Sequence, residues 1–293
     1  MLLKRIITAS ILATLIALAV FLLPMEYFSL AIGLITLLAA WEWSDLAGLS
    51  SKFKRVLFIA ALILPMSGLH FWTQLLEIVA QATDWTDVRD YSGILEWLVI
   101  PPVLFWILVM ILIRNTPAAV LALQLKTRSK LLIGWFILLS AWLFLSRLRS
   151  LYGSEMTMYF LILVWVADIS AYFAGKKWGT TKLAPEISPG KTVAGMYGAL
   201  ISGLVCAIVL NLYNLKYGFN PMIAADFTLI SILTVLISIY GDLFVSVVKR
   251  QRGVKDSGSL LPGHGGVLDR IDSLIAAIPF FYGCIYFIYR LTE

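Results

Sequence analysis

The sequence predicts an all-α fold, a polytopic integral membrane bundle of about nine transmembrane helices. Hydrophobic residues make up 60% of the 293 residues and charged residues only 14%, whereas a soluble domain is roughly half apolar and a quarter charged. The apolar residues also gather into runs that approach the roughly 20 residues needed to cross a bilayer. Both observations exclude a soluble domain with a single anchor and indicate one membrane unit with short loops.

Nine apolar runs are expected to span the membrane. The first follows two basic residues, as in a secretory signal peptide, but it is long, and no small-residue cleavage site precedes Pro24 and Glu26. We therefore expect it to be a retained helix. Residues 1–150 are predicted to form an N-terminal region of about five spans, and residues 151–293 a C-terminal catalytic region. The nine runs are residues 6–23, 27–43, 56–72, 98–113, 131–145, 156–174, 193–212, 227–248 and 267–289.

The loop between the third and fourth runs is rich in acidic residues. Such a loop is typical of either a cation site or a solvated connection, and we favour the solvated connection. The acids are Glu77, Asp84, Asp87, Asp90 and Glu96.

The loops carry lysine and arginine unevenly. Cytoplasmic loops of membrane proteins are enriched in these residues. With a cytoplasmic N-terminus and nine spans, all but five of the 23 basic residues fall on the cytoplasmic side. The predicted topology is therefore N-in and C-out, which places both motif-rich loops in the cytoplasm. The five exceptions are Arg89, Arg147, Arg149, Lys216 and Arg290.

The eighth apolar run contains an acid, Asp242. An ionisable residue inside a span is costly, so a function is the first hypothesis. Ser246 and Lys249 follow at intervals of four and seven residues, which puts all three on one helix face. A plain helix end with snorkelling Lys249 and Arg250 would explain the bases but not Asp242.

A glycine-rich loop, residues 253–266, joins the eighth run to the ninth. Glycines let such a loop fold back tightly, and its exposed backbone N–H groups can bind anions. Asp269 and Asp272 open the ninth run and are neighbours on one face, where acids also suit the helix dipole. Clustered carboxylates without matching His or Cys favour Mg²⁺, and nearby bases favour phosphates. Carboxylates, Mg²⁺ and basic side chains in one place are typical of sites for nucleotidyl or phosphoryl transfer.

A second polar segment precedes the seventh run. Asp168 is another intramembrane acid, with Ser170 and Tyr172 nearby. Residues 185–192, PEISPGKT, come close to a Walker A loop, but Pro185 stands where that pattern needs glycine and no preceding strand is expected. We therefore reject a P-loop ATPase.

The same segment can still prepare a phosphate site. We expect Ser188 to cap a helix that begins at Pro189. Lys191 and Thr192 would then lie at a helix N-terminus, which favours phosphate binding. An ordinary capped helix with an interfacial lysine is the alternative.

These two segments resemble the phosphatidate cytidylyltransferase family, also called CDP-diglyceride synthases. The resemblance is strong over residues 160–280, and the N-terminal half matches only in general character, including its WEW segment. Ala194 departs from the family pattern, in which an acid or amide often stands there. Residues 168–172 and the ISPGKT loop match a second family region. The long signature is filled by Ser246, Lys249, Arg250, Lys255, Asp256, His264, Gly265, Gly266, Asp269, Arg270 and Asp272.

The resemblance implies transfer of CMP from CTP to phosphatidic acid, with Mg²⁺ as cofactor and K⁺ left open as a second cation. It makes Asp242 and Asp269 metal ligands, with Asp256 and Asp272 as further ligands or as residues that orient them. The phosphate-holding bases would be Lys249, Arg250, Lys255 and Arg270. Substrate contacts are expected from Asp168, Tyr172, Ser188, Lys191, Thr192, Ser246, His264, Gly265 and Gly266.

The expected partners are CTP, phosphatidic acid and membrane lipid, without nucleic acid, and a homodimer is left open. The expected location is a bacterial inner membrane with the active site toward the cytoplasm. Two alternatives remain. One is another CTP-dependent lipid enzyme, a CDP-archaeol synthase or a polyprenol kinase. The other is an ion-coupled transporter that uses Asp168 and Asp242, although the sequence has no visible internal repeat of the transporter kind.

Overall fold

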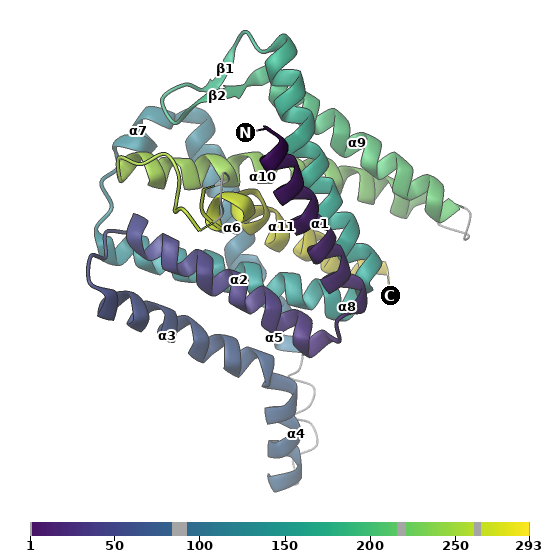
Figure 1. Cartoon of the computed structure of the whole chain (residues 1–293). Helices are drawn as coiled ribbons and strands as arrows, with labels where there is room; N and C mark the ends of the chain where they lie inside the picture. Colours follow the sequence, from purple (N-terminus) through teal and green to yellow (C-terminus); the bar gives the residue numbers. More distant parts are fainter. Residues whose placement is uncertain (1, 84–92, 216–220, 261–264, 293) are drawn as a thin grey trace.

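The computed structural model describes residues 2–83, 93–215, 221–260 and 265–292. This part of the chain is a bundle of helices with one short two-stranded sheet (Figure 1). The helices are α1 Leu2–Leu22, α2 Met25–Leu46, α3 Lys52–His70, α4 Trp72–Thr83, α5 Ile94–Trp97, α6 Ile100–Asn115, α7 Pro117–Ala122, α8 Thr127–Trp178, α9 Val193–Leu215, α10 Pro221–Gln251 and α11 Leu268–Thr292. The strands are β1 Lys182–Ala184 and β2 Ser188–Thr192.

The apolar runs of the sequence lie in helices, as a bilayer requires of backbone that must satisfy its own hydrogen bonds. Within the described residues, seven helical segments are long and apolar enough to cross a membrane. The fifth and sixth predicted runs both fall within α8, and the first run is α1, whose apolar part is described as Ser10–Leu22. The polytopic helix bundle is therefore confirmed, while the count of nine and the orientation stay predictions. The seven segments are Met25–Leu46, Lys52–His70, Ile94–Asn115, Thr127–Trp178, Val193–Tyr213, Ala224–Gln251 and Leu268–Ile288.

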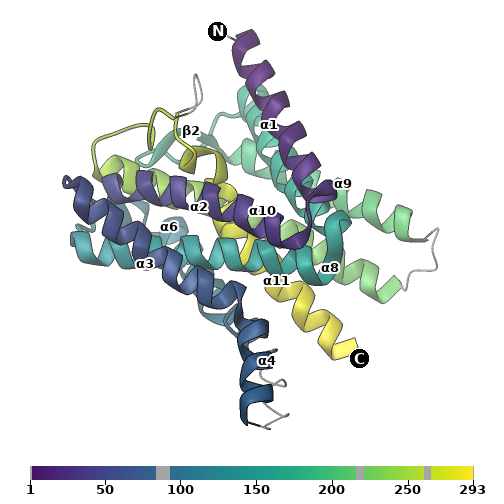
Figure 2. The same ribbon diagram turned by 60° about the horizontal axis from the view of Figure 1, so that its bottom comes forward.

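Helix α8 is two arms joined by a kink. Gly153 has φ 80° and ψ −179°, which is outside the helical region and which residues with a Cβ rarely adopt. Figures 1 and 2 show the arms running in different directions on either side of it. The second arm, toward Trp178, packs along α9. The proposed boundary between the two regions at residue 150 falls just before this kink and stays a prediction.

Small residues bring the helices of the second half close together. A Cβ on Gly241 of α10 would collide with Ala276 of α11, and a Cβ on Gly198 of α9 would collide with Ala174 of α8. Close backbone approach through such residues is a usual way for helices to pack in membranes. The contact at Gly241 holds α10 against α11 at the level of the neighbouring acid, Asp242.

The short sheet corrects the prediction made for residues 185–192. Strands β1 and β2 pair antiparallel, with Lys182 opposite Thr192 and Ala184 opposite Ser188. Ser188 therefore does not cap a helix, and Pro189 does not begin one. Helix α9 begins at Val193, and its N-cap is Thr192, whose Oγ1 accepts a hydrogen bond from Gly195 N at 3.1 Å.

A strand thus does precede this segment, contrary to the sequence prediction. It forms a hairpin with β2, so the resemblance to a Walker A loop still fails.

The acidic loop is also only partly solvated. Glu96 is 3% exposed, although it was predicted to lie in a solvated connection. Its carboxylate pairs with Arg147 of α8 and accepts a hydrogen bond from the Tyr282 hydroxyl of α11. Asp84, Asp87 and Asp90 lie outside the described residues.

Candidate active site

Three helices bring one acid each to the same region: Asp168 from α8, Asp242 from α10 and Asp272 from α11. Asp168 and Asp242 both lie within electrostatic range of Asp272. Ser273 Oγ donates to Asp168 Oδ1 at 3.4 Å, which ties α11 to α8. The fold therefore joins the two signature segments, which lie far apart in the sequence.

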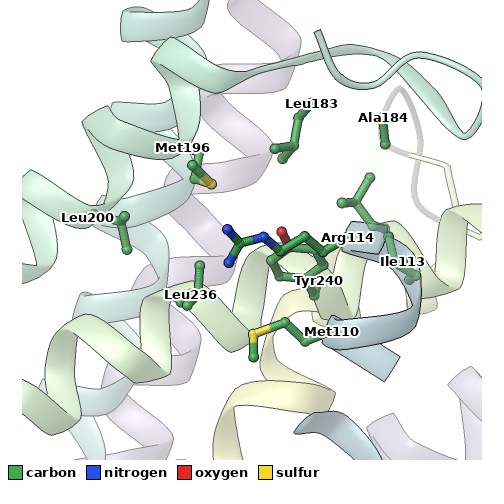
Figure 3. Close-up of a pocket in the computed structure, with 10 residues that line it drawn as sticks. Met110, Ile113, Arg114, Leu183, Ala184, Met196, Leu200, Leu236 and Tyr240 are labelled. Carbon is green, nitrogen blue, oxygen red and sulfur yellow. The ribbon is translucent and has the colours of Figure 1, made fainter. Parts of the chain in front are cut away.

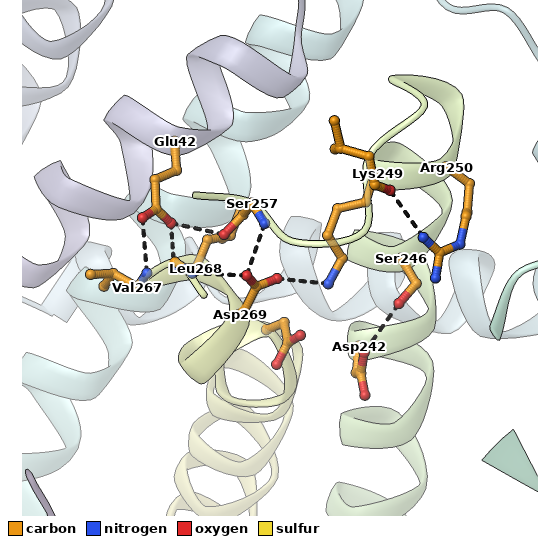
Figure 4. Close-up of polar contacts among 12 residues, drawn as sticks. Glu42, Asp242, Ser246, Lys249, Arg250, Ser257, Val267, Leu268 and Asp269 are labelled. Atoms are coloured by element: carbon orange, nitrogen blue, oxygen red, sulfur yellow. Dashed lines mark hydrogen bonds and ion pairs between the residues drawn. The ribbon is translucent and has the colours of Figure 1, made fainter. Parts of the chain in front are cut away.

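Lys191 connects the hairpin to this cluster. Its Nζ lies 2.6 Å from Asp242 Oδ2 and donates to the Ile239 carbonyl at 3.2 Å. Ser246 Oγ donates to Asp242 Oδ1 at 3.3 Å, as expected for residues that share a helix face (Figure 4). The side chains of Lys191 and Asp242 remain 24% and 27% exposed, so this ion pair is reachable from outside the protein.

Asp269 is fixed by the glycine-rich loop. Its Oδ1 accepts from Lys249 Nζ at 2.7 Å, and its Oδ2 accepts from the backbone N–H groups of Ser257 and Gly266 at 2.8 and 3.0 Å. Gly265 has φ 83°, and a Cβ there would lie 2.8 Å from Asp269 Oδ2. The predicted anion-binding loop therefore exists, and the anion that its N–H groups hold in this structure is the carboxylate of Asp269.

Glu42 of α2 is a site residue that the sequence reasoning missed. Its carboxylate accepts hydrogen bonds from Val267 N, Leu268 N and Ser257 Oγ at 2.9, 2.8 and 2.9 Å (Figure 4). The residue is 3% exposed. Because α11 begins at Leu268, Glu42 satisfies the free N–H groups of its first turn and holds the loop against α2. The signal that could have found it is an acid within the second apolar run.

Arg250 is occupied by backbone rather than open to a phosphate. Its Nε donates to the Ile187 carbonyl at 3.2 Å and its Nη1 to the Val254 carbonyl at 3.0 Å. These bonds tie the C-terminal end of α10 to the turn of the hairpin. Arg250 therefore supports the loop geometry in this structure.

The comparison with known proteins covers nearly the whole chain. Residues 3–288 match the model of the cytidylyltransferase family. The chain belongs to the cytidylyltransferase family. It is 36% identical over 289 residues to the phosphatidate cytidylyltransferase of Haemophilus influenzae, covering 96% of this chain and 97% of that protein. It is 39% identical over 282 residues to the phosphatidate cytidylyltransferase of Pseudomonas aeruginosa, covering 96% of each chain.

A third relative matches a shorter part of the chain. The phosphatidate cytidylyltransferase of Bacillus subtilis is 40% identical over 134 residues, which is 45% of this chain and 47% of that protein. The family assignment predicted from the two signature segments is therefore confirmed.

The remaining predicted site residues that the structure describes lie in the glycine-rich loop and on α8 and α11. Lys255 and Asp256 are exposed in the loop, and Asp256 lies beside Gly265. Arg270 is exposed at the start of α11, within electrostatic range of Asp168. Tyr172 is 62% exposed on α8, with Lys176 Nζ 6.0 Å above its ring. His264 lies outside the described residues.

The carboxylates of the site are near one another but do not form a closed metal-binding arrangement in the described part of the chain. In the described part of the chain, no group of three or more His, Cys, Asp or Glu side chains has a metal-binding arrangement. Lysine ammonium groups neutralise Asp242 and Asp269 instead. The oxygen donors still have the chemistry that Mg²⁺ prefers.

Proposed function

We propose that this chain is a phosphatidate cytidylyltransferase, which transfers CMP from CTP to phosphatidic acid and releases pyrophosphate. The observation that carries the proposal is the partly exposed Lys191–Asp242 ion pair, which joins the two signature segments at a cluster of acids. Two relatives with this printed name match 96% of the chain at 36% and 39% identity. The family assignment disfavours the ion-coupled transporter.

The reaction needs positioning more than acid–base chemistry. A phosphate oxygen of phosphatidic acid attacks the α-phosphorus of CTP and forms the new P–O bond. The bond from that phosphorus to the oxygen bridging the β-phosphate breaks, and pyrophosphate leaves with the electron pair. The nucleophile is already anionic, so no strong base is required. Alignment and charge neutralisation account for most of the expected acceleration.

Lys191 and Lys249 are the residues we expect to change partners when substrate binds. Each ammonium is held 2.6–2.7 Å from one carboxylate oxygen, and the Lys249 pair lies beside the glycine-rich loop. Phosphate oxygens would compete for these ammonium groups and form charge-assisted hydrogen bonds with them. Lys255 and Arg270, both exposed near the same loop, would hold further phosphate oxygens.

Mg²⁺ belongs to the proposal, with Asp168, Asp242 and Asp272 as the residues that would hold it. A bound Mg²⁺ would neutralise charge on the phosphate oxygens of CTP. Asp269 and Asp256 remain expected ligands. Asp269 already accepts hydrogen bonds from Lys249, Ser257 and Gly266, and its Oδ1, which accepts only that from Lys249, is the oxygen with room for a cation. K⁺ remains a second expected cation.

The proposed location is a bacterial inner membrane, with the N-terminus and the active site on the cytoplasmic side. The bacterial relatives and the distribution of basic residues support it. CTP and Mg²⁺ are available on that side.

The function is tested with purified protein in detergent–lipid mixed micelles that contain phosphatidic acid and Mg²⁺. CTP labelled at the α-phosphate should transfer its label to the lipid phase, whereas CTP labelled at the γ-phosphate should not. Chelation with EDTA should stop the transfer. Transfer of γ-label would instead indicate a lipid kinase, and α-label accepted only by an archaeol phosphate would indicate a CDP-archaeol synthase. Absence of α-label from every lipid would refute the proposal.

A further inference from the structure

A pocket lies between α6, α9, α10 and β1 (Figure 3). Its volume is about 300 Å³. Eight of its ten lining residues have apolar side chains, among them Met110, Met196, Leu200 and Leu236. Tyr240 and Arg114 contribute its polar side chains. A pocket that is apolar apart from a few placed polar groups is typical of a ligand site.

Arg114 gives the pocket its charge. It lies in the last turn of α6, at the end of the candidate span Ile94–Asn115, and its guanidinium points into the pocket beside Tyr240 (Figure 3). Among the residues that the structure describes, Arg114 forms no hydrogen bond or ion pair. Arg114 is exposed, and its guanidinium beside a largely apolar pocket is available for charge-assisted hydrogen bonds with an anion.

The pocket and the acid pair involve different side chains of α10. Tyr240 and Asp242 are two residues apart, and at about 100° per residue their side chains leave the helix in nearly opposite directions. Leu236, Tyr240 and Leu243 line the pocket, whereas Asp242 pairs with Lys191. The anion expected in the pocket is therefore a second one, bound by Arg114 rather than by Lys191.

The surroundings favour a lipid over a soluble anion. Helix α9, which lines the pocket with Met196 and Leu200, also exposes Ile201 and Val205, which are 61% and 52% exposed and suit the hydrocarbon of a membrane. A free phosphate would pair with Arg114 but leave the apolar lining empty. We propose that this pocket binds an anionic phospholipid, with its phosphate on Arg114 and part of one acyl chain between Met196, Leu200 and Leu236.

The test uses the full chain in a neutral detergent without CTP, so it is independent of the proposed reaction. Native mass spectrometry measures binding of dioleoyl phosphatidylglycerol, which is not a substrate of that reaction, and of the zwitterionic dioleoyl phosphatidylethanolamine. Phosphatidylglycerol should bind more tightly. Arg114→Gln should weaken its binding about tenfold through loss of a charge-assisted contact. Arg128→Gln, an exposed arginine at the start of α8, is the matched control and should leave binding unchanged.

Leu200→Trp tests the apolar half of the site with Arg114 intact. The larger side chain fills the pocket and should also weaken phosphatidylglycerol binding. If Arg114→Gln does not fold, the Leu200→Trp variant alone tests whether the pocket binds the lipid. Equal binding by wild type and both pocket variants overturns the proposal, as does an equal loss in Arg128→Gln. Displacement of the lipid by millimolar inorganic phosphate would assign the site to a soluble anion and would equally overturn it.

Discussion

Two clusters of charge lie about ten residues, or roughly 15 Å, apart along α11, and they treat their carboxylates differently. Around Tyr282, Glu96 gives one oxygen to Arg147 and the other to the tyrosine hydroxyl, and its side chain is 4% exposed. Around Asp272, the Asp242 side chain is 27% exposed and its pair with Lys191 is open to exchange. A buried, fully paired carboxylate joins helices, whereas an accessible one can change partners when a phosphate or a cation arrives.

The largest effect on activity is expected for Asp242→Asn, which tests whether the accessible carboxylate has the functional role. The change keeps the shape of the side chain but removes the charge beside Lys191, so we expect kcat to fall by about 10²–10³. The thermal unfolding temperature should change little because the pair is partly exposed. The measurement is transfer of α-label from CTP to lipid over a range of Mg²⁺ concentrations. Full activity at limiting Mg²⁺ would show that Asp242 is not a metal ligand.

Glu96→Gln should have the opposite profile. Removal of one partner from a buried pair leaves Arg147 uncompensated, and we expect a loss of about 3 kcal/mol in the free energy of unfolding. The kcat of the folded fraction should stay within a factor of about two, because the cluster is remote from the acids. Thermal unfolding in detergent and the same label assay measure the two effects. Glu155→Gln, at an exposed site on α8, is the control. A large fall in kcat without loss of stability would contradict the division of roles.

The smallest effect is expected at Glu42. Glu42→Gln keeps one carbonyl oxygen but replaces the other acceptor by an NH₂ group, which cannot accept from Val267 N or Leu268 N. We expect a loss of about 1–2 kcal/mol in local stability. Amide hydrogen exchange should become faster at residues 257–268 and remain unchanged at Glu96, which belongs to the buried cluster around Tyr282. Unchanged hydrogen exchange in the loop would show that Glu42 does not hold the loop in place.

The sequence predicted the helices well because apolar runs in a bilayer have few structural options. It also predicted the shared face of Asp242 and Ser246, since their contact depends only on helical spacing. It could not predict that Lys249 turns to Asp269 on another helix. Contacts of that kind depend on how the helices are arranged, which local spacing does not encode.

The errors have the same cause. Ser188 has the composition of a helix cap, but pairing with β1 extends its backbone and moves the cap to Thr192. Glu96 lies in an acid-rich stretch, yet Arg147 and Tyr282 bury it. The partners of Glu42 lie more than 200 residues away in the chain. A single sequence does not reveal such distant partners.

The hydrogen bonds of Glu42 also affect whether parts of the chain can function when they are expressed as separate fragments. An expressed fragment that starts after α2 would retain every signature residue, but the first turn of α11 would lose its acceptors. The glycine-rich loop would lose the carboxylate that receives the Ser257 hydroxyl. We expect such a fragment to be inactive alone and to recover activity when α1 and α2 are supplied as a separate polypeptide, as in a split-protein complementation assay. The second half of the chain therefore depends on a helix from the first half to hold its glycine-rich loop.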